Sequence, residues 1–291
     1  MKPTLTRRRF LHRSLLTAAA AGGATWFDVP KLLASTRAES LKRFGGFPMG
    51  IQSYSLRAFG VNGALEKTHA LGLHWIEFFR AHYPPVPDPA KVAAMNTKLK
   101  KYDITISCHG VQPFTNNHAA NRKIFEFAKM AGIKTISANP TPDSFGSLDK
   151  LVAEFDIRIA IHNHGPGALY DQPVDAWKAV AGHDRRIGFC ADLGHYIRSG
   201  IDPVEVAYIL GDRLYGVHLK DFAEQKKKTR GVILGKGFLD VEGVFRALKK
   251  IGFPADGALS LEYEENPNDP MADIRECLEV ASEAAQKVAA G

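Results

Sequence analysis

Short apolar runs alternate with longer amphipathic segments along most of the chain. The short runs are rich in β-branched residues and apolar on both faces, as the strands of a parallel sheet are, and the longer segments have the spacing of helices. The predicted strands are 49–56, 74–79, 104–109, 135–138, 158–164, 187–192, 214–220 and 259–263. The predicted helices lie near 62–71, 88–101, 118–131, 146–154, 171–181, 202–210, 240–250 and 270–288.

Several of these helix boundaries carry residues that favour them. Gly72 and Gly132 follow predicted helices, where a glycine commonly ends the last turn. Asp88, Asp202 and Asp269 each precede a proline, which places a capping side chain ahead of a proline in the first turn. Eight strands alternating with eight helices predict a closed (β/α)₈ TIM barrel. The sequence has neither the G-x-G-x-x-G turn after its first strand nor the Walker A motif.

Size and composition fit one large globular domain. The chain has 291 residues, of which 45% are hydrophobic and 24% charged, so the disordered and fibrous classes are excluded. Its formal charge of +7 is concentrated near the N-terminus. Residues 1–38 carry seven basic residues and one acidic residue, which leaves +1 for residues 39–291. A large basic surface for nucleic acid is therefore not expected.

The N-terminus has the order of an export signal. The sequence TRRRFL at residues 6–11 resembles the twin-arginine motif, and an apolar stretch rich in Ala and Gly follows over 15–26. That stretch is too short for a convincing membrane span; a disordered basic tail is the alternative interpretation. We expect a signal peptide over 1–38, a linker over 39–46 and a barrel domain over 47–291, with export to the periplasm and no stable membrane insertion.

Polar side chains collect at the predicted C-terminal ends of the strands, where (β/α)₈ barrels hold their active sites. These residues are Glu77, His109, His162, Asn163, His164, Asp192, His195, His218, Lys220 and Glu262. Carboxylates and imidazoles that converge from several strands suit a divalent cation. Such a cation polarises the carbonyl of a sugar, while a nearby carboxylate moves a proton on the adjacent carbon.

Four motifs in fixed order resemble a known family. They are ADLGH at 191–195, GVHLKD at 216–221, LGKG at 234–237 and LE at 261–262. Together they resemble the xylose isomerase-like barrel superfamily, the sugar phosphate isomerase/epimerase group, over about residues 47–288. Each motif alone is weak, but the ordered set is fairly specific. The resemblance implies a TIM barrel that acts on a small carbohydrate through an enediolate.

The resemblance also implies a metal site. The family's ligands are a Glu, an Asp, a His and a Glu on strands five to eight, and the last three fall on Asp192, His218 and Glu262. At strand five this chain has His162 in place of the usual Glu. We expect one divalent ion held by these four residues, and the imidazole makes Mn²⁺, Zn²⁺, Co²⁺ or Fe²⁺ a better fit than Mg²⁺.

The remaining strand-end residues are interpreted around that ion. Glu262 and His109 are the predicted catalytic bases. The predicted substrate contacts are Glu77, His164, His195 and Lys220. For each of these the alternative is a structural role, such as packing, a salt bridge or orientation of a ligand. With one carboxylate ligand replaced by His162, two-base epimerisation is disfavoured, because a neutral metal-bound imidazole does not readily take the place of that base.

Four functions follow from this pattern. The first is a metal-dependent sugar isomerase or epimerase, and the second is a keto-glycoside lyase or hydratase that uses the same site for β-elimination. An endonuclease IV-like repair enzyme would need a basic DNA face, which the near-neutral charge of residues 39–291 opposes. A non-catalytic sugar-binding protein is the fourth. The expected partner is a small carbohydrate and not a nucleic acid, and the sequence leaves a homo-oligomer open.

Overall fold

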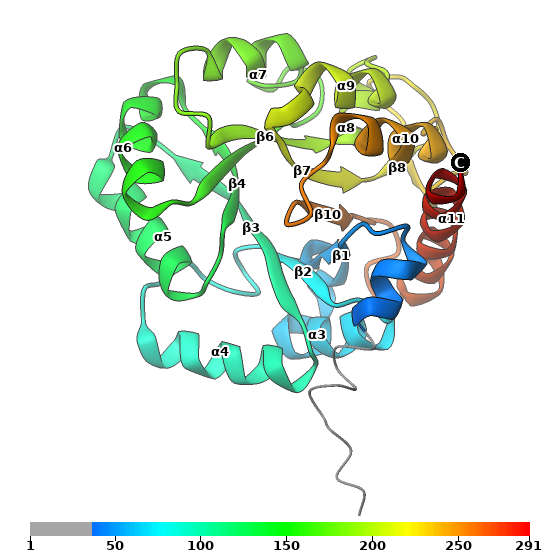
Figure 1. Ribbon diagram of the computed structural model, residues 1–291, viewed down its shortest axis with the longest axis horizontal. Helices are drawn as coiled ribbons and strands as arrows, with labels where there is room; N and C mark the ends of the chain where they lie inside the picture. Colours follow the sequence, from blue (N-terminus) through cyan, green and yellow to red (C-terminus); the bar gives the residue numbers. More distant parts are fainter. Residues whose placement is uncertain (1–36) are drawn as a thin grey trace, which may run out of the picture. The chain divides into compact units, whose positions relative to one another are not determined.

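The computed structural model describes residues 37–291, which form a closed barrel of eight parallel strands ringed by helices (Figure 1). The barrel strands are β1 (Met49–Gln52), β2 (Trp75–Phe78), β3 (Thr105–Phe114), β4 (Thr135–Pro140), β5 (Arg158–His162), β6 (Ile187–Asp192), β7 (Leu214–Leu219) and β10 (Ala258–Leu261). Neighbours in the sequence are neighbours in the barrel, and β10 pairs with β1 to close it. The predicted (β/α)₈ barrel is confirmed.

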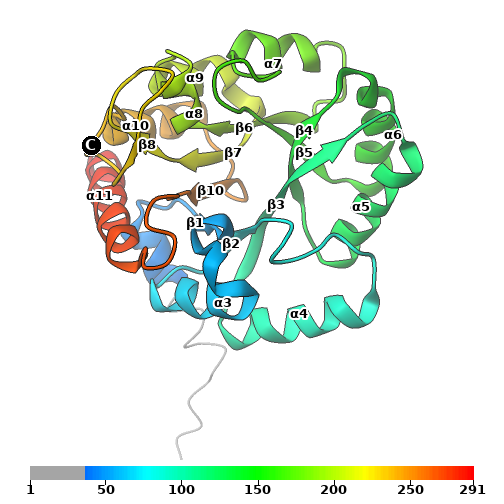
Figure 2. The same cartoon turned by 180° about the vertical axis from the view of Figure 1, so that it is seen from behind.

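The helices lie outside the strands, as Figure 2 shows from the other side of the barrel. They are α3 (Gly60–Ala70), α4 (Pro89–Lys101), α5 (His118–Met130), α6 (Phe145–Phe155), α7 (Pro173–Val180), α8 (Leu193–Arg198), α9 (Pro203–Leu210), α10 (Val241–Ile251) and α11 (Met271–Ala290). Asp88 and Asp202 accept hydrogen bonds from backbone N–H groups in the first turns of α4 and α9, as predicted. Asp269 was a wrong prediction, since Pro270 precedes α11 and no side chain caps that helix.

The structure adds elements that the hydrophobic pattern did not predict. Helix α8 follows β6 directly, and a two-stranded antiparallel hairpin, β8 (Asp221–Phe222) and β9 (Gly231–Val232), follows β7. Strand β3 also runs beyond His109 to Phe114. All three lie at the C-terminal ends of barrel strands. Elements of two to six residues are too short for a periodic pattern to reveal, and together they build up the mouth of the barrel.

The barrel interior below this mouth holds small and polar side chains. Ser137 on β4 and Ser260 on β10 both donate hydrogen bonds to Glu77 on β2, although these strands are not neighbours, so all three side chains point into the barrel. Successive residues of a strand point to opposite sides. Ile136 and Val217, each next to an inward-pointing residue, are buried on the outer side against the helices. The outer layer therefore supplies the apolar core, and the interior is left free for polar chemistry.

One glycine lets two strands approach closely beneath the site. A Cβ on Gly110 would lie 2.2 Å from both the carbonyl oxygen and the Oγ of Ser137. Any larger residue there would push β3 away from β4. Because Ser137 Oγ donates to Glu77 at 2.7 Å, the shape of the barrel at Gly110 helps to keep the Glu77 carboxylate in place.

The segment before the barrel packs on its last helix. Residues 37–43 are helical, Phe44 is fully buried, and Arg43 forms an ion pair of 2.6 Å with Glu279 on α11. Ser282 Oγ on the same helix donates to the carbonyl of Arg43 at 3.0 Å. Nearly all of the predicted signal peptide, residues 1–36, lies outside the described residues. Within 37–291, none of the helices has both the length and the apolar character needed to cross a membrane.

Candidate metal centre and active-site cleft

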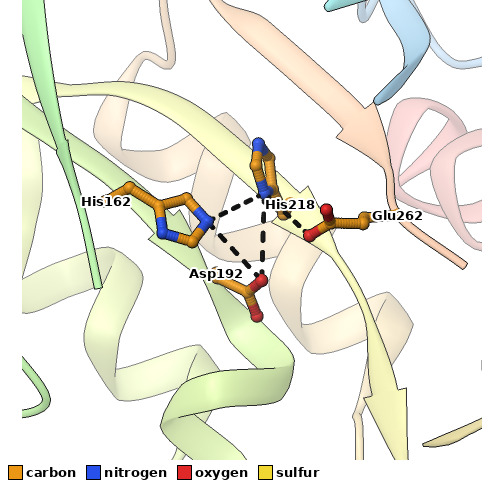
Figure 3. Close-up of side chains that lie close together, drawn as sticks. All are labelled: His162, Asp192, His218 and Glu262. Atoms are coloured by element: carbon orange, nitrogen blue, oxygen red, sulfur yellow. Dashed lines mark hydrogen bonds and ion pairs between the residues drawn. The ribbon is translucent and has the colours of Figure 1, made fainter. Parts of the chain in front are cut away.

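Four side chains from successive strands meet at the C-terminal mouth of the barrel (Figure 3). His162 ends β5, Asp192 ends β6, His218 lies on β7 and Glu262 follows β10. His162 Nε2 lies 3.1 Å from His218 Nδ1 and 3.7 Å from Asp192 Oδ2. His218 Nδ1 lies 3.1 Å from Glu262 Oε2 and 3.8 Å from Asp192 Oδ2. The four residues predicted as metal ligands are therefore brought together.

The separations within this cluster fit a bound cation. Ligand atoms about 2.1 Å from a tetrahedral zinc ion lie roughly 3.4 Å from one another. Four of the six separations in the cluster are 3.1 to 3.8 Å, and all lie within 4.8 Å. Asp192 is fully buried and Glu262 nearly so, and two neighbouring buried carboxylates need positive charge nearby. Lys220 Nζ supplies one positive charge, 3.4 Å from each. Two imidazoles and two carboxylates form a donor set suited to Zn²⁺, Mn²⁺, Co²⁺ or Fe²⁺.

The orientation of His218 gives a further reason for a cation. Its Nε2 lies 2.9 Å from an oxygen of Glu77, and an ionised carboxylate can only accept, so Nε2 donates the hydrogen bond. In the neutral ring this leaves Nδ1 unprotonated, with its lone pair directed at His162 and Glu262. A lone pair facing a carboxylate oxygen is repulsive unless a positive charge lies between them. That charge can be a proton on Nδ1, because burial alone would lower the pKa of His218 but the nearby carboxylates outweigh burial and raise it, or it can be a metal ion bound through Nδ1.

The sequence predicted Glu77 as a substrate contact, and the structure places its carboxylate against the ring of His218. It is fully buried, and it accepts hydrogen bonds from His218 and from Ser137 and Ser260 at 2.7 and 3.0 Å. Burial alone would raise the pKa of Glu77, but the charge of His218 and these hydrogen bonds outweigh burial and lower it. Glu77 therefore lies behind His218 and fixes the orientation of its ring, as carboxylates commonly do for metal-binding histidines.

His109 is also placed differently from its predicted role as a base. Its ring is buried, Nε2 donates to the carbonyl of Tyr83 at 2.7 Å, and Nδ1 accepts from the Gln112 amide at 2.9 Å. Burial lowers the pKa of His109 to about 4. With both nitrogens occupied and no face on the cleft, the ring supports β3. The next residues along β3, Gly110 and Val111, line the cleft instead.

The end of β6 is held by hydrogen bonds to the loop after β5 and to helix α8. Asn163, directly after β5, donates from its amide to the carbonyl of Asp192 at 3.0 Å and accepts from the backbone N–H of Asp192 at 2.8 Å. Asp192 Oδ1 accepts from the backbone N–H of His195 at 2.8 Å and so caps helix α8. Its Oδ2 faces His162 and His218. Asp192 is thus the last residue of β6, the N-terminal cap of α8 and a member of the four-residue cluster.

A cavity of about 360 Å³ opens directly above the cluster. His162 and Glu262 line it, together with three predicted substrate contacts, His164, His195 and Lys220. Sequence reasoning missed several lining residues, among them Tyr54, Phe79, Arg80 and Glu264. Of these, Glu264 had a usable signal, because it stands two residues after Glu262, the spacing that places two side chains on one side of an extended chain.

Lys220 is a buried cation among carboxylates. Only 5% of the residue is exposed, and its Nζ lies 3.4 Å from both Asp192 and Glu262 and forms a short ion pair with Glu264. Burial alone would lower the pKa of Lys220, but the three carboxylates outweigh burial and raise it. Lys220 is therefore charged at neutral pH, and it borders the cavity beside Glu262.

The side of the cavity formed by the β5 and β6 loops carries imidazoles. The ring centroids of His162 and His164 are 4.8 Å apart, and those of His164 and His195 are 5.5 Å apart. Burial lowers the pKa of both His164 and His195 to about 4. These rings are neutral at physiological pH, so they can both donate and accept hydrogen bonds.

The chain is similar to known proteins both in sequence and in structure. An inosose dehydratase of Clostridium botulinum is 28% identical over 137 residues, which are 42% of this chain and 45% of that protein. The chain thus spans less than half the length of the curated relatives it matches. A protein of Parabacteroides distasonis has a similar structure, with a TM-score of 0.64 and 26% identity over 83% of this chain and 98% of that one.

A D-tagatose 3-epimerase-like protein shares the fold as well, with a TM-score of 0.67 and 18% identity over 82% of this chain and 97% of that one. Residues 65–283 match the sequence profile of the xylose isomerase-like TIM barrel. The closed eight-stranded barrel and the profile agree along most of the chain. The chain belongs to the xylose isomerase-like TIM barrel family.

Proposed function

We propose that the chain is a metal-dependent lyase that eliminates water or an alcohol from a polyhydroxylated ketone such as a keto-sugar. The observation that carries this proposal is the position of Glu262. It is the one carboxylate of the four-residue cluster that also lines the cavity, whereas Asp192 faces only the cluster and its neighbours. A substrate in the cavity therefore meets a single cluster carboxylate, beside His162.

The elimination uses Glu262 as the base. A metal ion in the cluster would supply a Lewis acid that polarises the ketone of the substrate. Glu262 removes the proton from the carbon next to the carbonyl. The electron pair of that C–H bond forms a carbon–carbon double bond, and the bond to the β-oxygen breaks. The products are an unsaturated ketone and water or an alcohol.

Lys220 assists the same step. Its ammonium group lies 3.4 Å from Glu262 Oε2. Burial would raise the pKa of Glu262, but Lys220 and His218 lower it to about 2, so the base is ionised at neutral pH. The proton that Glu262 takes from carbon is passed to the leaving oxygen, which needs one proton to depart as water or an alcohol. The Lys220 ammonium donates a hydrogen bond to the same oxygen as its charge develops.

Two-base epimerisation fits this cavity less well. It needs a second base on the other face of the substrate. The β5 and β6 loops line the cavity with the imidazoles of His162, His164 and His195 and with no carboxylate. Glu264 is a carboxylate, but it follows Glu262 on the same segment and is paired with Lys220. The replacement of a family carboxylate by His162 therefore favours chemistry with one base.

Sugar isomerisation is the second proposal that the same site supports. A single base next to a polarised carbonyl can also return the proton to the neighbouring carbon and interconvert an aldose and a ketose. Proteins similar to this chain are named for both kinds of chemistry, a dehydratase and an epimerase-like protein. We prefer elimination because the curated proteins similar to this chain in sequence include inosose dehydratases.

A substrate panel tests the proposal. Metal-loaded protein is given inososes, 3-keto-glucosides and free ketoses, and the unsaturated ketone is followed by its ultraviolet absorbance while products are identified by NMR. We expect the absorbance of a conjugated ketone to rise with a keto-sugar or an inosose. Interconversion of free aldoses and ketoses without that absorbance would replace the lyase by the isomerase. No turnover of any of these substrates would overturn both.

A further inference from the structure

A second cavity of about 290 Å³ adjoins the first. The two share three lining residues, Lys220, Glu262 and Glu264. Its remaining walls come from helix α8, from the β8–β9 hairpin and from the loop after β10. The proposed base therefore stands at the junction of two cavities and not at the bottom of one.

The hairpin wall is firmly built. Asp221 accepts hydrogen bonds from the backbone N–H groups of Gly235, Gly237 and Leu239 at 2.9 to 3.0 Å. A Cβ on Gly237 would lie 2.2 Å from the carbonyl oxygen of Phe222, so the chain can fold this closely only with glycine there. The LGKG segment is thus wrapped around Asp221, and this holds β8 beside the cavity.

The lining of the second cavity combines both charges with aromatic rings. Beyond the three shared residues it includes Arg198, Arg230, Thr229, Glu265, Phe222 and Tyr263. The guanidinium of Arg198 lies 5.6 Å from the centre of the Phe222 ring, and its Nε donates to the carbonyl of Lys227 at 3.3 Å. Carboxylates on the wall oppose an anion, and the many polar groups oppose an apolar ligand. Donors, acceptors and aromatic faces together suit a neutral ring bearing hydroxyl groups.

We propose that the second cavity is a saccharide subsite, which holds the leaving-group side of a glycosidic substrate while the keto-sugar ring occupies the first cavity. This inference rests on the proposed lyase function. A ketone at C3 of a hexoside makes the C2 proton acidic and places the glycosidic C1–O bond in the β position. Glu262 removes the C2 proton, a C1–C2 double bond forms, and the alcohol leaves with the proton into the second cavity.

The test compares one- and two-ring ligands. Turnover is measured with the 3-keto derivatives of methyl glucosides and of the disaccharides trehalose, maltose and cellobiose. Binding of the unoxidised disaccharides and methyl glucosides is measured by calorimetry, which needs no turnover. We expect at least one disaccharide to exceed its methyl glycoside about tenfold in kcat/KM and in affinity, because a filled subsite adds several hydrogen bonds.

Single substitutions test whether the disaccharide preference arises in the second cavity. Arg198→Ala and Glu265→Ala each remove one polar wall of the second cavity, and we expect either to reduce the disaccharide preference about tenfold. Arg246→Ala, which changes an exposed arginine on α10 paired with Glu242, is the matched control and should keep the preference. Equal kcat/KM and equal affinity for one- and two-ring ligands would overturn the subsite. A disaccharide preference in binding with no turnover of any keto-sugar would keep the subsite and overturn the lyase.

Discussion

The carboxylate of Glu77 accepts a hydrogen bond from His218 Nε2 at 2.9 Å, on the side of the ring that faces away from the metal cluster. Since Glu77 is fully buried and also accepts from two serines, its position is fixed on three sides. This arrangement keeps the proton on Nε2 and leaves Nδ1 free to bind a metal. Glu77, which does not line the cavity, therefore determines which nitrogen of His218 is available to bind a metal ion.

We expect Glu77→Gln to weaken metal affinity by about 10- to 100-fold. The amide can still accept from His218, but it lacks the negative charge that makes the imidazole more basic. Affinity is measured by competition with a chromophoric chelator, and folding by circular dichroism. Glu126→Gln, at a half-buried residue of α5 paired with Arg122, is the control. An unchanged metal affinity in folded Glu77→Gln would show that Glu77 has only a packing role.

Metal removal is the second prediction. Dialysis against a strong chelator should abolish activity and lower the melting temperature, because an ion that binds only the folded chain stabilises it. Mn²⁺, Zn²⁺, Co²⁺ or Fe²⁺ should restore both better than Mg²⁺, since two of the four ligands are imidazoles. His162→Ala should bind each ion more weakly. Full activity of metal-free protein, verified by elemental analysis, would refute the metal centre.

The third prediction concerns the N-terminus, for which we propose twin-arginine export to the periplasm. Changing Arg7 and Arg8 together to Lys should retain the full-length chain in the cytoplasm, because that route reads the arginine pair itself and not its charge. Arg13→Lys, outside the motif, is the matched control and should leave export intact. Cell fractionation and immunoblotting measure the distribution. Normal export of the double variant would rule out the twin-arginine route.

The barrel could be predicted from the sequence because alternating strands and helices predict the fold. The C-terminal ends of parallel strands meet at one mouth, and the resemblance to the family's ligand motifs singled out His162, Asp192, His218 and Glu262 as a candidate metal site there. How deep a given side chain lies below the mouth of the barrel cannot be predicted from such a pattern. Glu77 points inward like a substrate contact, but the tilt and register of the strands place it beneath His218.

His109 illustrates a second limit of the sequence. A histidine near a strand end satisfies the pattern of a catalytic base, yet β3 continues to Phe114, and the His109 ring binds the carbonyl of Tyr83 from another loop. Contacts between loops far apart in the sequence determine such roles, and the pattern of apolar residues does not encode them. The hairpin that forms one wall of the second cavity was not predicted either. Its strands, β8 and β9, contain two residues each, which is too few for a periodic pattern.

The last prediction concerns the proposed base. Glu262→Gln should reduce turnover by about 10²- to 10⁴-fold, because the amide cannot accept the proton from carbon. The fold should persist, and metal affinity is measured in parallel to separate loss of the base from loss of the ion. Exchange of the substrate α-proton with solvent deuterium should be slowed equally, since it reports the same proton transfer.

His162→Glu is the informative companion, because it restores the carboxylate that the family carries at this position and so adds a second base to the cavity wall. We expect this variant to gain 3-epimerisation of free ketoses, which the unmodified chain should catalyse poorly compared with elimination. Product stereochemistry is followed by NMR in deuterated solvent. Efficient inversion at C3 by the unmodified chain would mean that a neutral imidazole, His164 or His195, serves as the second base. The inference drawn from His162 would then be wrong, because an imidazole of the β5 or β6 loop would do the work of the missing carboxylate.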